Sequence, residues 1–532
     1  MLAKSRFGPD IKICMCFRKG LPVLVIAAAV CAGAQSNLVV VTRSGPVQGA
    51  PSSDSKIRMF KGIPYAAPPV GNLRWKPPQP VAPWSTPRAG MGFGSRCMQG
   101  RIFPDMIFRD PGPSEDCLTL NVWTPAVSAE ERLPVMVWVY GGGFAGGGTS
   151  EPRQDGEALA HKGVVVVSMN YRLGIFGFFV HRDLAKESPH HAAGNYGLLD
   201  QAAALQWVHD NIAAFGGDPS IVTIFGESAG SFSVSGLMAS PLSKPLIARA
   251  IGESGALFGR GLQRGTVAQA DEADRQFARE HLGTDSLEEL RAKPASELLE
   301  ATLKARSGIR FSTVVDGYFL PETAAAIYES GKQAHVPLLA GWNAAEQSST
   351  NIFGKGEKTA ARYRAWVTEH FGEHADAILA AYPANSDQEA QDSAQALASD
   401  QFIAFSTWKW IETHLETGHS PVWRYLFEDA PPMREGPSRG AYHSAEIEFV
   451  FHNLKYKDLP WRPVDEKLSD LMSTYWTNFA KTGDPNGRDL PKWPQYSQET
   501  NYQVMHLKEN AKAAPATDRA RYQALEKIPP QT

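Results

Sequence analysis

The sequence predicts an α/β fold in which a mostly parallel central sheet is flanked by helices and interrupted by large helical insertions. Short, continuously apolar runs such as residues 133–139 and 164–168 alternate with longer stretches of helical periodicity. This alternation is typical of parallel strands that are covered on both faces. The length of 532 residues, 43% of them hydrophobic and 20% charged, is sufficient for a large core. A serine flanked by glycines, at residues 226–230, also stands between one such strand and a helix.

The elements can be placed in order along the chain. Residues 38–60 are expected to form a small N-terminal β-element, and the proline-rich residues 62–87 to be extended rather than helical. Apolar residues recur at helical spacing over 198–214, and the glycines at 216–217 then stop the helix. Because no linker rich in serine or glycine divides the chain, a single domain over residues 35–532 is expected. The other strands are expected at 221–225, 248–251, 336–342 and 422–427, and the other helices over 268–305, 357–417 and 464–481.

Five apolar residues at the end of the last insertion also recur at helical spacing. Such a stripe is more typical of a face buried in the core than of a binding surface. The residues are Phe402, Phe405, Trp408, Ile411 and Leu415.

The N-terminus has the three parts of a secretion signal. Arg18 and Lys19 precede the apolar run 21–30 and the small residues 32–34, which predicts a signal peptide at residues 1–34 that is removed. The apolar run is too short to span a bilayer comfortably, so we expect no transmembrane segment. The protein is therefore expected to be secreted or periplasmic.

Cysteine usage agrees with export. Removal of the signal would leave Cys97 and Cys117 as the remaining pair, which predicts one disulfide closing a short loop. Two unpaired buried thiols are the alternative. For the N-terminus, the sequence also allows a buried helix, translation from Met15 and lipid attachment at Cys31.

Charge and motif content argue against several classes of partner. The formal net charge is −3, and no long basic run or nucleic-acid signature is present, so no nucleic-acid partner is expected. The chain has no clustered cysteines and no histidines at metal spacing, so no metal or cofactor is expected. Residues 141–146 satisfy G-x-G-x-x-G, but no helical pattern follows before Pro152, and the next strand ends in Asn170 rather than an acid. A dinucleotide site is therefore rejected.

The run Gly226-Glu227-Ser228-Ala229-Gly230 has the context of a nucleophile elbow, a sharp turn that exposes a reactive serine. It follows the expected strand 221–225 and precedes the helix-compatible run 231–239. A crowded turn needs small residues beside the serine, and the two glycines supply them. The N-terminus of the following helix would place partial positive charge near the serine. An ordinary glycine-rich turn is the alternative.

A serine hydroxyl is a poor nucleophile near neutral pH and needs a base that is oriented by an acid. In this strand–turn–helix context the acid and then the base follow the serine, each beyond a strand. Glu346 follows the expected strand 336–342, and His443 follows the strand 422–427. Among the 14 histidines, His452 is the nearest competitor, and a role of His443 as a loop residue bonded to backbone is the alternative.

Several separated motifs accompany the elbow. They are FKGIPYA at 60–66, SEDCL at 114–118, NVW at 121–123, YGGGF at 140–144, NYGLLDQ at 195–201 and FGGDP at 215–219. With these motifs the chain resembles the type-B carboxylesterases over residues 39–507, including members like the bacterial para-nitrobenzyl esterases. This is the α/β-hydrolase family that also contains the cholinesterases.

The resemblance implies an α/β-hydrolase fold and a serine ester hydrolase that acts on a small-molecule ester without a cofactor. It implies Ser228 as the nucleophile, His443 as general base and then acid, and Glu346 as the orienting acid. Three backbone N–H groups would hold the oxyanion. They belong to Gly142, Gly143 and Ala229.

The resemblance also implies supporting features around the site. These are a disulfide between Cys97 and Cys117, a buried ion pair of Arg74 and Glu115, a second carboxylate at Glu227 that tunes His443, and Ser254 beside the acid. Two features depart from the family pattern. The acid stands in Ala-Glu-Gln instead of Asp-Glu-Gly, and the loop 97–117 has no tryptophan to hold a quaternary ammonium, which argues against a choline ester specialist.

Two other functions use the same features. One is a binding or adhesion protein on the same fold, and the other is hydrolysis of an amide, carbamate or lactone by the same triad. The pocket walls are expected to come from the insertions 97–117, 257–315 and 347–420. Aromatic residues that could line an apolar pocket or equally belong to the core are Phe144, Phe178 and Trp342.

Overall fold

A computed structural model describes residues 38–258, 263–305 and 310–528. The expected signal peptide, with Met15 and Cys31, lies outside the described residues. Within them, no helix is both long enough and apolar enough to cross a membrane.

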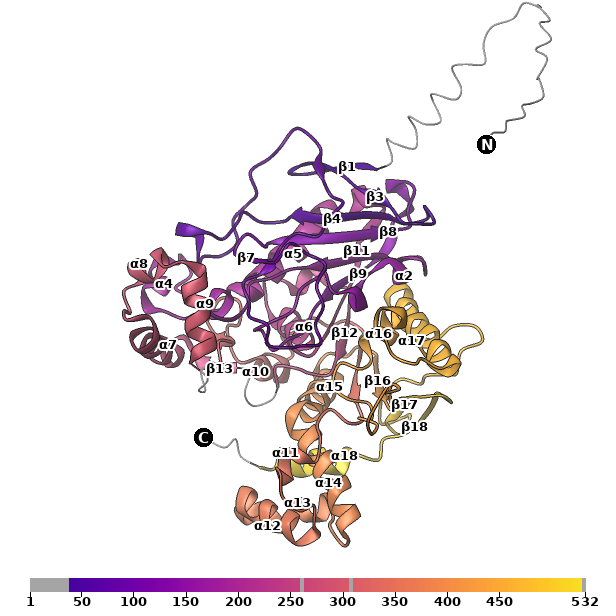
Figure 1. The fold of residues 1–532 in the computed structure, drawn as a ribbon. Coiled ribbons are helices and arrows are strands. Elements are labelled where there is room, and N and C mark those ends of the chain that lie inside the picture. The colour runs from indigo at the N-terminus through magenta and orange to yellow at the C-terminus, as the bar shows by residue number, and fades with distance from the viewer. Residues whose placement is uncertain (1–37, 259–262, 306–309, 529–532) are drawn as a thin grey trace, which may run out of the picture.

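An eleven-stranded, mostly parallel sheet forms the centre of the described chain (Figure 1). Its strand order is β18-β17-β16-β15-β12-β11-β9-β10-β8-β4-β3, and the strands from β10 through β17 run parallel. The strands are β3 (Ala50–Pro51), β4 (Arg58–Pro64), β8 (Thr119–Thr124), β9 (Leu133–Val139), β10 (Val165–Met169), β11 (Gly217–Glu227), β12 (Arg249–Glu253), β15 (Leu338–Asn343), β16 (Val422–Phe427), β17 (Gln503–Leu507) and β18 (Lys512–Pro515). The predicted fold class is confirmed.

Helices cover both faces of this sheet. On one face lie α5 (Tyr196–Asn211), α6 (Ala229–Ala239), α10 (Ala324–Glu329) and α15 (Phe405–Thr417). On the other lie α2 (Glu157–Ala160), α16 (Ile447–Val450) and α17 (Pro463–Thr482). Double coverage explains why β9 is buried from Val135 to its end and reads as a continuous apolar run.

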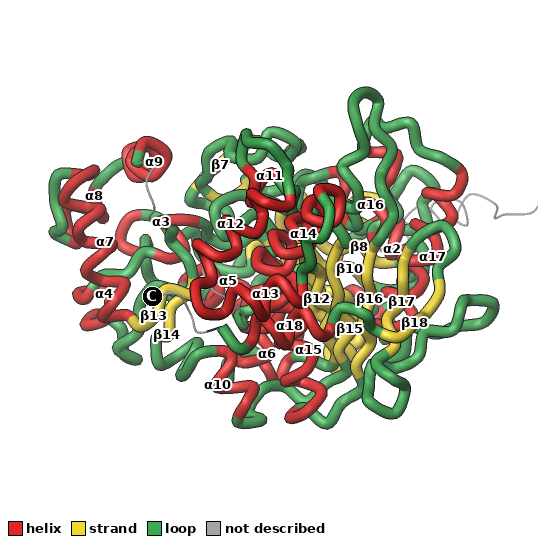
Figure 2. Tube along the Cα trace, turned by 90° about the horizontal axis from the view of Figure 1, so that it is seen from below, coloured by secondary structure: helices red, strands yellow, loops and turns green. Residues whose placement is uncertain are grey.

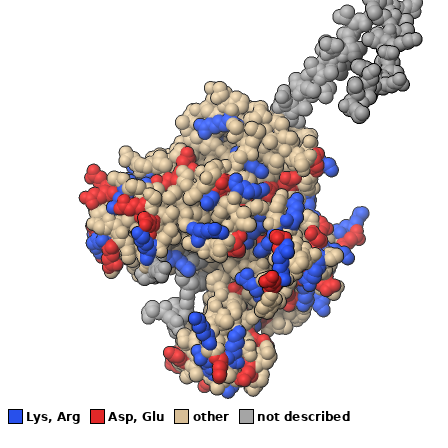
Figure 3. Space-filling view, viewed as in Figure 1, with Lys and Arg blue, Asp and Glu red and all other residues tan. Residues whose placement is uncertain are grey.

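Two groups of inserted helices extend from this body (Figures 1 and 2). The first contains α4 (Arg182–Glu187), α7 (Val267–Leu282), α8 (Leu287–Ala292) and α9 (Ala295–Lys304). The second, which we call the helical lobe, contains α11 (Thr350–Phe353), α12 (Ala360–Phe371), α13 (Ala375–Ala381) and α14 (Asp387–Ser399), has a small core of its own, and packs against α18 (Arg519–Glu526). On the face drawn in Figure 3, charged residues of both signs are interspersed.

The expected elements match the structure closely, with one correction. The strands expected at 133–139 and 422–427 have those bounds, and the helix expected at 464–481 runs from Pro463 to Thr482. In the apolar stripe, Trp408 is 3% exposed, but Phe402 is 44% exposed and does not belong to the core. Phe402 lies in a π-helical segment, η7 (Asp400–Ala404), whose wider turn breaks the phase of a 3.6-residue stripe.

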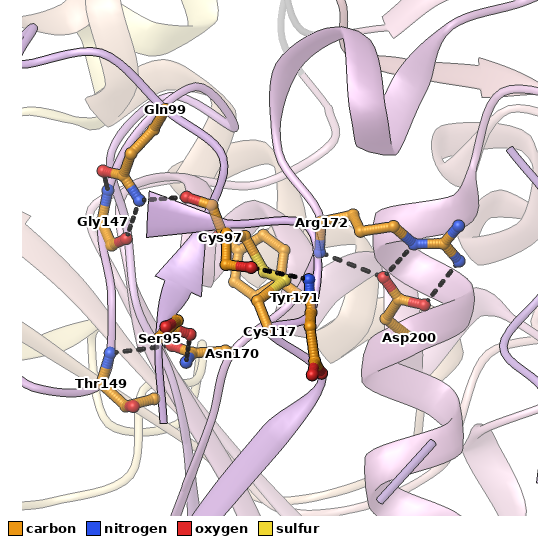
Figure 4. The surroundings of a disulfide bond; sticks show 12 residues. Ser95, Cys97, Gln99, Cys117, Gly147, Thr149, Asn170, Tyr171, Arg172 and Asp200 are labelled. Atoms are coloured by element: carbon orange, nitrogen blue, oxygen red, sulfur yellow. Dashed lines mark hydrogen bonds and ion pairs between the residues drawn. A yellow bond between two sulfur atoms is a disulfide. The ribbon is translucent and has the colours of Figure 1, made fainter. Parts of the chain in front are cut away.

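A buried ion pair joins the end of β10 to helix α5 (Figure 4). The guanidinium of Arg172 donates to both carboxylate oxygens of Asp200 at 2.8 and 2.7 Å, and both side chains are buried. The expected pair of Arg74 and Glu115 is also present at 2.6 Å and is largely buried. Because desolvated charges need a partner, loss of one member should leave the other unpaired in the interior.

We expect Arg172→Met to destabilise the protein by about 3–5 kcal/mol, because Asp200 would remain as an uncompensated buried charge. Guanidinium-induced unfolding would measure the change. Arg279→Met is the control, since Arg279 and its partners Glu272 and Asp285 are much more exposed and such pairs contribute at most about 1 kcal/mol. Equal losses in the two variants would contradict this account.

Candidate active site

Ser228 stands at the turn between strand β11 and helix α6 with a left-handed backbone conformation, φ 52°. The turn allows no side chain at either flanking glycine. A Cβ added to Gly230 would lie 1.9 Å from the carbonyl oxygen of Val139, and one added to Gly226 would lie 2.6 Å from the same oxygen. The close packing of β9 against the turn therefore holds Ser228 in an uncommon conformation at the end of the sheet.

The structure brings Ser228, His443 and Glu346 together. The Nε2 atom of His443 lies 3.0 Å from Ser228 Oγ, and its Nδ1 atom lies 2.6 Å from Glu346 Oε2. The loops after β15 and β16 reach one another through a bridge between Ala345 and Tyr442. Side chains from three distant parts of the chain thus form one hydrogen-bonded line.

The carboxylate of Glu346 is fully buried and held from several sides. Its Oε1 atom accepts hydrogen bonds from Ser254 Oγ at 2.6 Å and from the Asn343 N–H at 2.8 Å. The N–H of Gln347, in the position where the family pattern has glycine, donates to Ser399 Oγ at 3.0 Å. The Ala-Glu-Gln sequence is therefore compatible with an ordered acid loop.

A second carboxylate faces the imidazole. Glu227 Oε1 lies 3.3 Å from His443 Nε2 and accepts a hydrogen bond from Ser444 Oγ at 2.5 Å. Burial raises the pKa of Glu227, although the His443 charge opposes that rise. The expected position of Glu227 beside the base is the one observed.

Glu446 is a third buried carboxyl near the ring, and sequence reasoning missed it. Its Oε2 atom accepts a hydrogen bond from Asn343 Nδ2 at 2.5 Å. Burial, followed by repulsion from Glu227 and Glu346, raises the pKa of Glu446 well above its usual range. Its place three residues after His443 was the one signal that could have found it.

These carboxylates set the charge of the imidazole. Burial alone would disfavour the protonated ring, but attraction to Glu227 and Glu346 outweighs it and raises the pKa of His443 to about 9. The site is thus organised to stabilise a positive charge on His443.

The glycine run after β9 lies against the elbow. Gly142 and Gly143 have φ angles of 111° and 63°, and a Cβ on Gly142 would lie 2.3 Å from the carbonyl oxygen of Gly146. Within the described residues, the N–H groups of Gly142 and Gly143 donate to no other backbone group. Ala229 is the first residue of α6, so its N–H has no partner within the helix. These three N–H groups are free to bind an anion formed beside Ser228.

The disulfide loop is bonded to this glycine run (Figure 4). Cys97 and Cys117 are joined, as expected. The side-chain amide of Gln99 donates to the carbonyls of Gly147 at 2.6 Å and Cys97 at 3.0 Å, and its oxygen accepts from the Gly147 N–H at 2.9 Å. The disulfide loop therefore helps to hold the backbone that carries the free N–H groups.

A cavity of about 510 Å³ opens at Ser228. Each expected insertion contributes to its wall, through Phe103, Arg310 and Phe402 among others. A second cavity of about 320 Å³ has mainly apolar walls and shares Gly142 and Gly143 with the wall of the first.

Other candidates from the sequence lie elsewhere. Phe144, Phe178 and Trp342 are buried in the core, and none of them lines the Ser228 cavity. His452 bonds to Ser469 Oγ at 3.0 Å and takes no part in the site. Within the described ranges, no cluster of three or more His, Cys, Asp or Glu side chains is arranged to hold a metal ion.

Comparison with known proteins gives one consistent family. The sequence model of the carboxylesterase family matches residues 36–525. Fumonisin B1 esterase of Sphingopyxis macrogoltabida is 39% identical, with 89% of this chain and 87% of that protein covered. Carboxylesterase 5A of Canis lupus familiaris is 38% identical, with coverages of 91% and 88%.

Solved structures agree with the sequence matches. The carboxylesterase Est55 of Geobacillus stearothermophilus superimposes with a TM-score of 0.79 at 32% identity, over 92% of this chain and 99% of that one. A PNB esterase structure gives a TM-score of 0.78 at 32% identity, over 93% and 100%.

We expect Gly230→Ala to destabilise the protein by about 3 kcal/mol or more, because the added methyl group would overlap the Val139 carbonyl in a packed interior. Gly236→Ala in the same helix is the control, since its methyl group would meet only the end of the Leu257 side chain. Chemical unfolding of both variants tests the constraint. A Gly230→Ala variant as stable as Gly236→Ala would show that the turn can relax.

Proposed function

Because the chain belongs to the carboxylesterase family, we propose that it hydrolyses carboxylic esters through an acyl-enzyme formed on Ser228. The observation that carries this proposal is the line of hydrogen bonds from Ser228 through His443 to Glu346. This line supplies the nucleophile, the base and the orienting acid that acyl transfer needs.

In the first half-reaction, Ser228 Oγ attacks the ester carbonyl carbon while His443 Nε2 takes the hydroxyl proton. The carbonyl π electrons move to oxygen, and the N–H groups of Gly142, Gly143 and Ala229 would stabilise the resulting oxyanion. When the oxyanion collapses, the bond to the alcohol oxygen breaks. His443 gives its proton to that oxygen, and the alcohol leaves.

In the second half-reaction, water takes the place of the alcohol. His443 removes a proton from water, the hydroxide attacks the acyl carbon, and the oxyanion forms again. Collapse then breaks the bond to Ser228 Oγ, which recovers its proton from His443. A carboxylic acid is released, and the enzyme returns to its starting state.

The carboxylates beside His443 favour the imidazolium of both tetrahedral intermediates. Glu346 fixes the ring through Nδ1, and Glu227 faces Nε2 at 3.3 Å. This stabilisation has an opposing effect on the resting enzyme, because a raised pKa leaves less neutral His443 to act as base near neutral pH.

The proposal extends to substrate and location. Fumonisin B1 esterase, by its name, acts on fumonisin B1, and the two neighbouring cavities here would suit an ester with two sizeable arms. Residues 35–532 would form one catalytic domain behind a signal peptide at residues 1–34, and the disulfide suits an exported protein.

An amide, carbamate or lactone could use the same groups, whereas the intact Ser228–His443 line disfavours a purely binding role.

Ser228→Ala should abolish turnover of p-nitrophenyl butyrate, with a loss of about 10⁶-fold in kcat for this kind of nucleophile. A fluorophosphonate probe should label Ser228 in the wild-type protein, as located by peptide mass spectrometry. Ser235→Ala, in the same helix and without contact with the triad, is the control. Turnover that survives in Ser228→Ala would refute the mechanism.

The pH dependence of kcat/KM should show a limb that falls on acidification with an apparent pKa near 9, because the protonated His443 cannot act as base. Glu227→Gln removes a negative charge from the ring, disfavours the imidazolium and should move this limb about 1 unit to lower pH. Glu253→Gln is the control, since that buried carboxyl bonds to Trp476 and not to His443. If the apparent pKa of this limb were the same in Glu227→Gln as in wild type, an effect of the Glu227 charge on His443 would be excluded.

A further inference from the structure

One short segment, residues 399–403, contacts both the loop that carries Glu346 and the ring of His443. Ser399 Oγ accepts the hydrogen bond of the Gln347 N–H, next to Glu346. The ring of Phe402 meets the His443 ring edge-on, with centroids 5.1 Å apart and planes at 80°. Because Phe402 also lines the cavity at Ser228, this segment is a wall of the site as well as a support for it. We call it the pocket segment.

The conformation of the pocket segment needs support from outside. Asp400–Ala404 is π-helical, and π-helical turns are rare because they are less favourable than a continuous α-helix. This turn points Phe402 toward His443 and out of the apolar stripe that continues with Trp408. A tighter α-helical turn would change the direction of the Phe402 side chain.

Asp400 supplies the anchor of the pocket segment. Its carboxylate is buried, accepts a hydrogen bond from the Tyr382 hydroxyl at 2.8 Å and lies 3.2 Å from Nε of Arg521. Burial raises the pKa of Asp400 to about 6, and the Arg521 charge opposes that rise. A buried carboxylate needs such a partner, so Arg521 stabilises the first residue of the π-helical turn.

Arg521 lies on α18, which packs against both the main body and the helical lobe (Figures 1 and 2). At one end of this helix Asp518 pairs with the buried Arg424. Tyr522 packs between Trp342 and Trp408 of the main body, and Leu525 belongs to the core of the helical lobe. The helix is therefore fixed on both sides and can hold Arg521 in one place.

We propose that Arg521 of the C-terminal helix is a positioning residue for the reaction, which acts through Asp400 to hold Phe402 against His443. The proposal rests on the proposed function, because it assigns to this contact a role in orienting the base and shaping the cavity. Arg521 itself touches neither the cavity nor the triad.

Arg521→Met tests the proposal, because it keeps most of the side-chain bulk and removes the charge. It should lower kcat/KM for p-nitrophenyl butyrate about 10- to 100-fold, mainly through kcat, since small displacements of catalytic groups have effects of that size. Arg519→Met is the matched control. Arg519 lies on the same helix and pairs with Glu412, away from the pocket segment, so its loss should leave kcat/KM within about twofold of wild type.

A double-mutant cycle with Phe402→Ala separates positioning from a general loss of stability. If both residues act through one contact with His443, the double variant should lose no more activity than the worse single variant. Arg521→Lys should recover part of the activity, and it also serves if Arg521→Met fails to fold. Equal activities of the Arg521→Met and Arg519→Met proteins, or multiplicative losses in the double variant, would overturn the proposal.

Ser228→Ala, measured beside these variants, distinguishes a failure of the proposed function from a failure of the proposed role of Arg521. An active Ser228→Ala protein would refute the proposed function itself. An inactive Ser228→Ala protein together with a fully active Arg521→Met protein would refute only the role of the C-terminal helix.

Discussion

The site depends on the hydrogen bonds that hold the buried carboxylate of Glu346. A charge placed in the interior must be met by donors, and here Ser254, Asn343 and His443 supply them. Ser254 follows β12, Asn343 ends β15 and His443 lies in the long loop after β16. Satisfying one carboxylate therefore also fixes the distances between these segments. The orientation of the His443 ring follows from this bond, and with it the alignment of Nε2 toward Ser228.

Around this centre, the fold adds supports that lie progressively farther from the reacting atoms. The packing of β9 against Gly230 fixes the elbow, and the Gln99 amide ties the glycine run to the disulfide loop. The pocket segment then connects the acid loop and the His443 ring to the last helix of the chain. The candidate site is thus connected by contacts that reach from the disulfide loop to α18.

The parts of this arrangement that sequence reasoning recovered are those with local signatures. The elbow and the strands before Glu346 and His443 are each visible within a few residues, and the cysteine pair follows from counting the cysteines that remain after signal removal. Phe402 was misassigned to the core because the apolar stripe was read at 3.6 residues per turn. A single π-helical turn changes the direction in which the side chains of such a stripe point. Arg521 was missed because its partner Asp400 lies far away in the sequence, which no local pattern encodes. Glu446 was missed because its partner Asn343 is also distant in the sequence, and its place three residues after His443 was the one local signal.

Trapping the acyl-enzyme would show whether Ser228 is the nucleophile. The wild-type protein would be mixed with excess p-nitrophenyl butyrate, quenched in acid within milliseconds, digested and analysed by peptide mass spectrometry. We expect a butyryl group on the peptide that contains Ser228, formed together with an initial burst of p-nitrophenol. Rapid turnover with no acyl group on Ser228, or with the acyl group on another side chain, would contradict this role of Ser228.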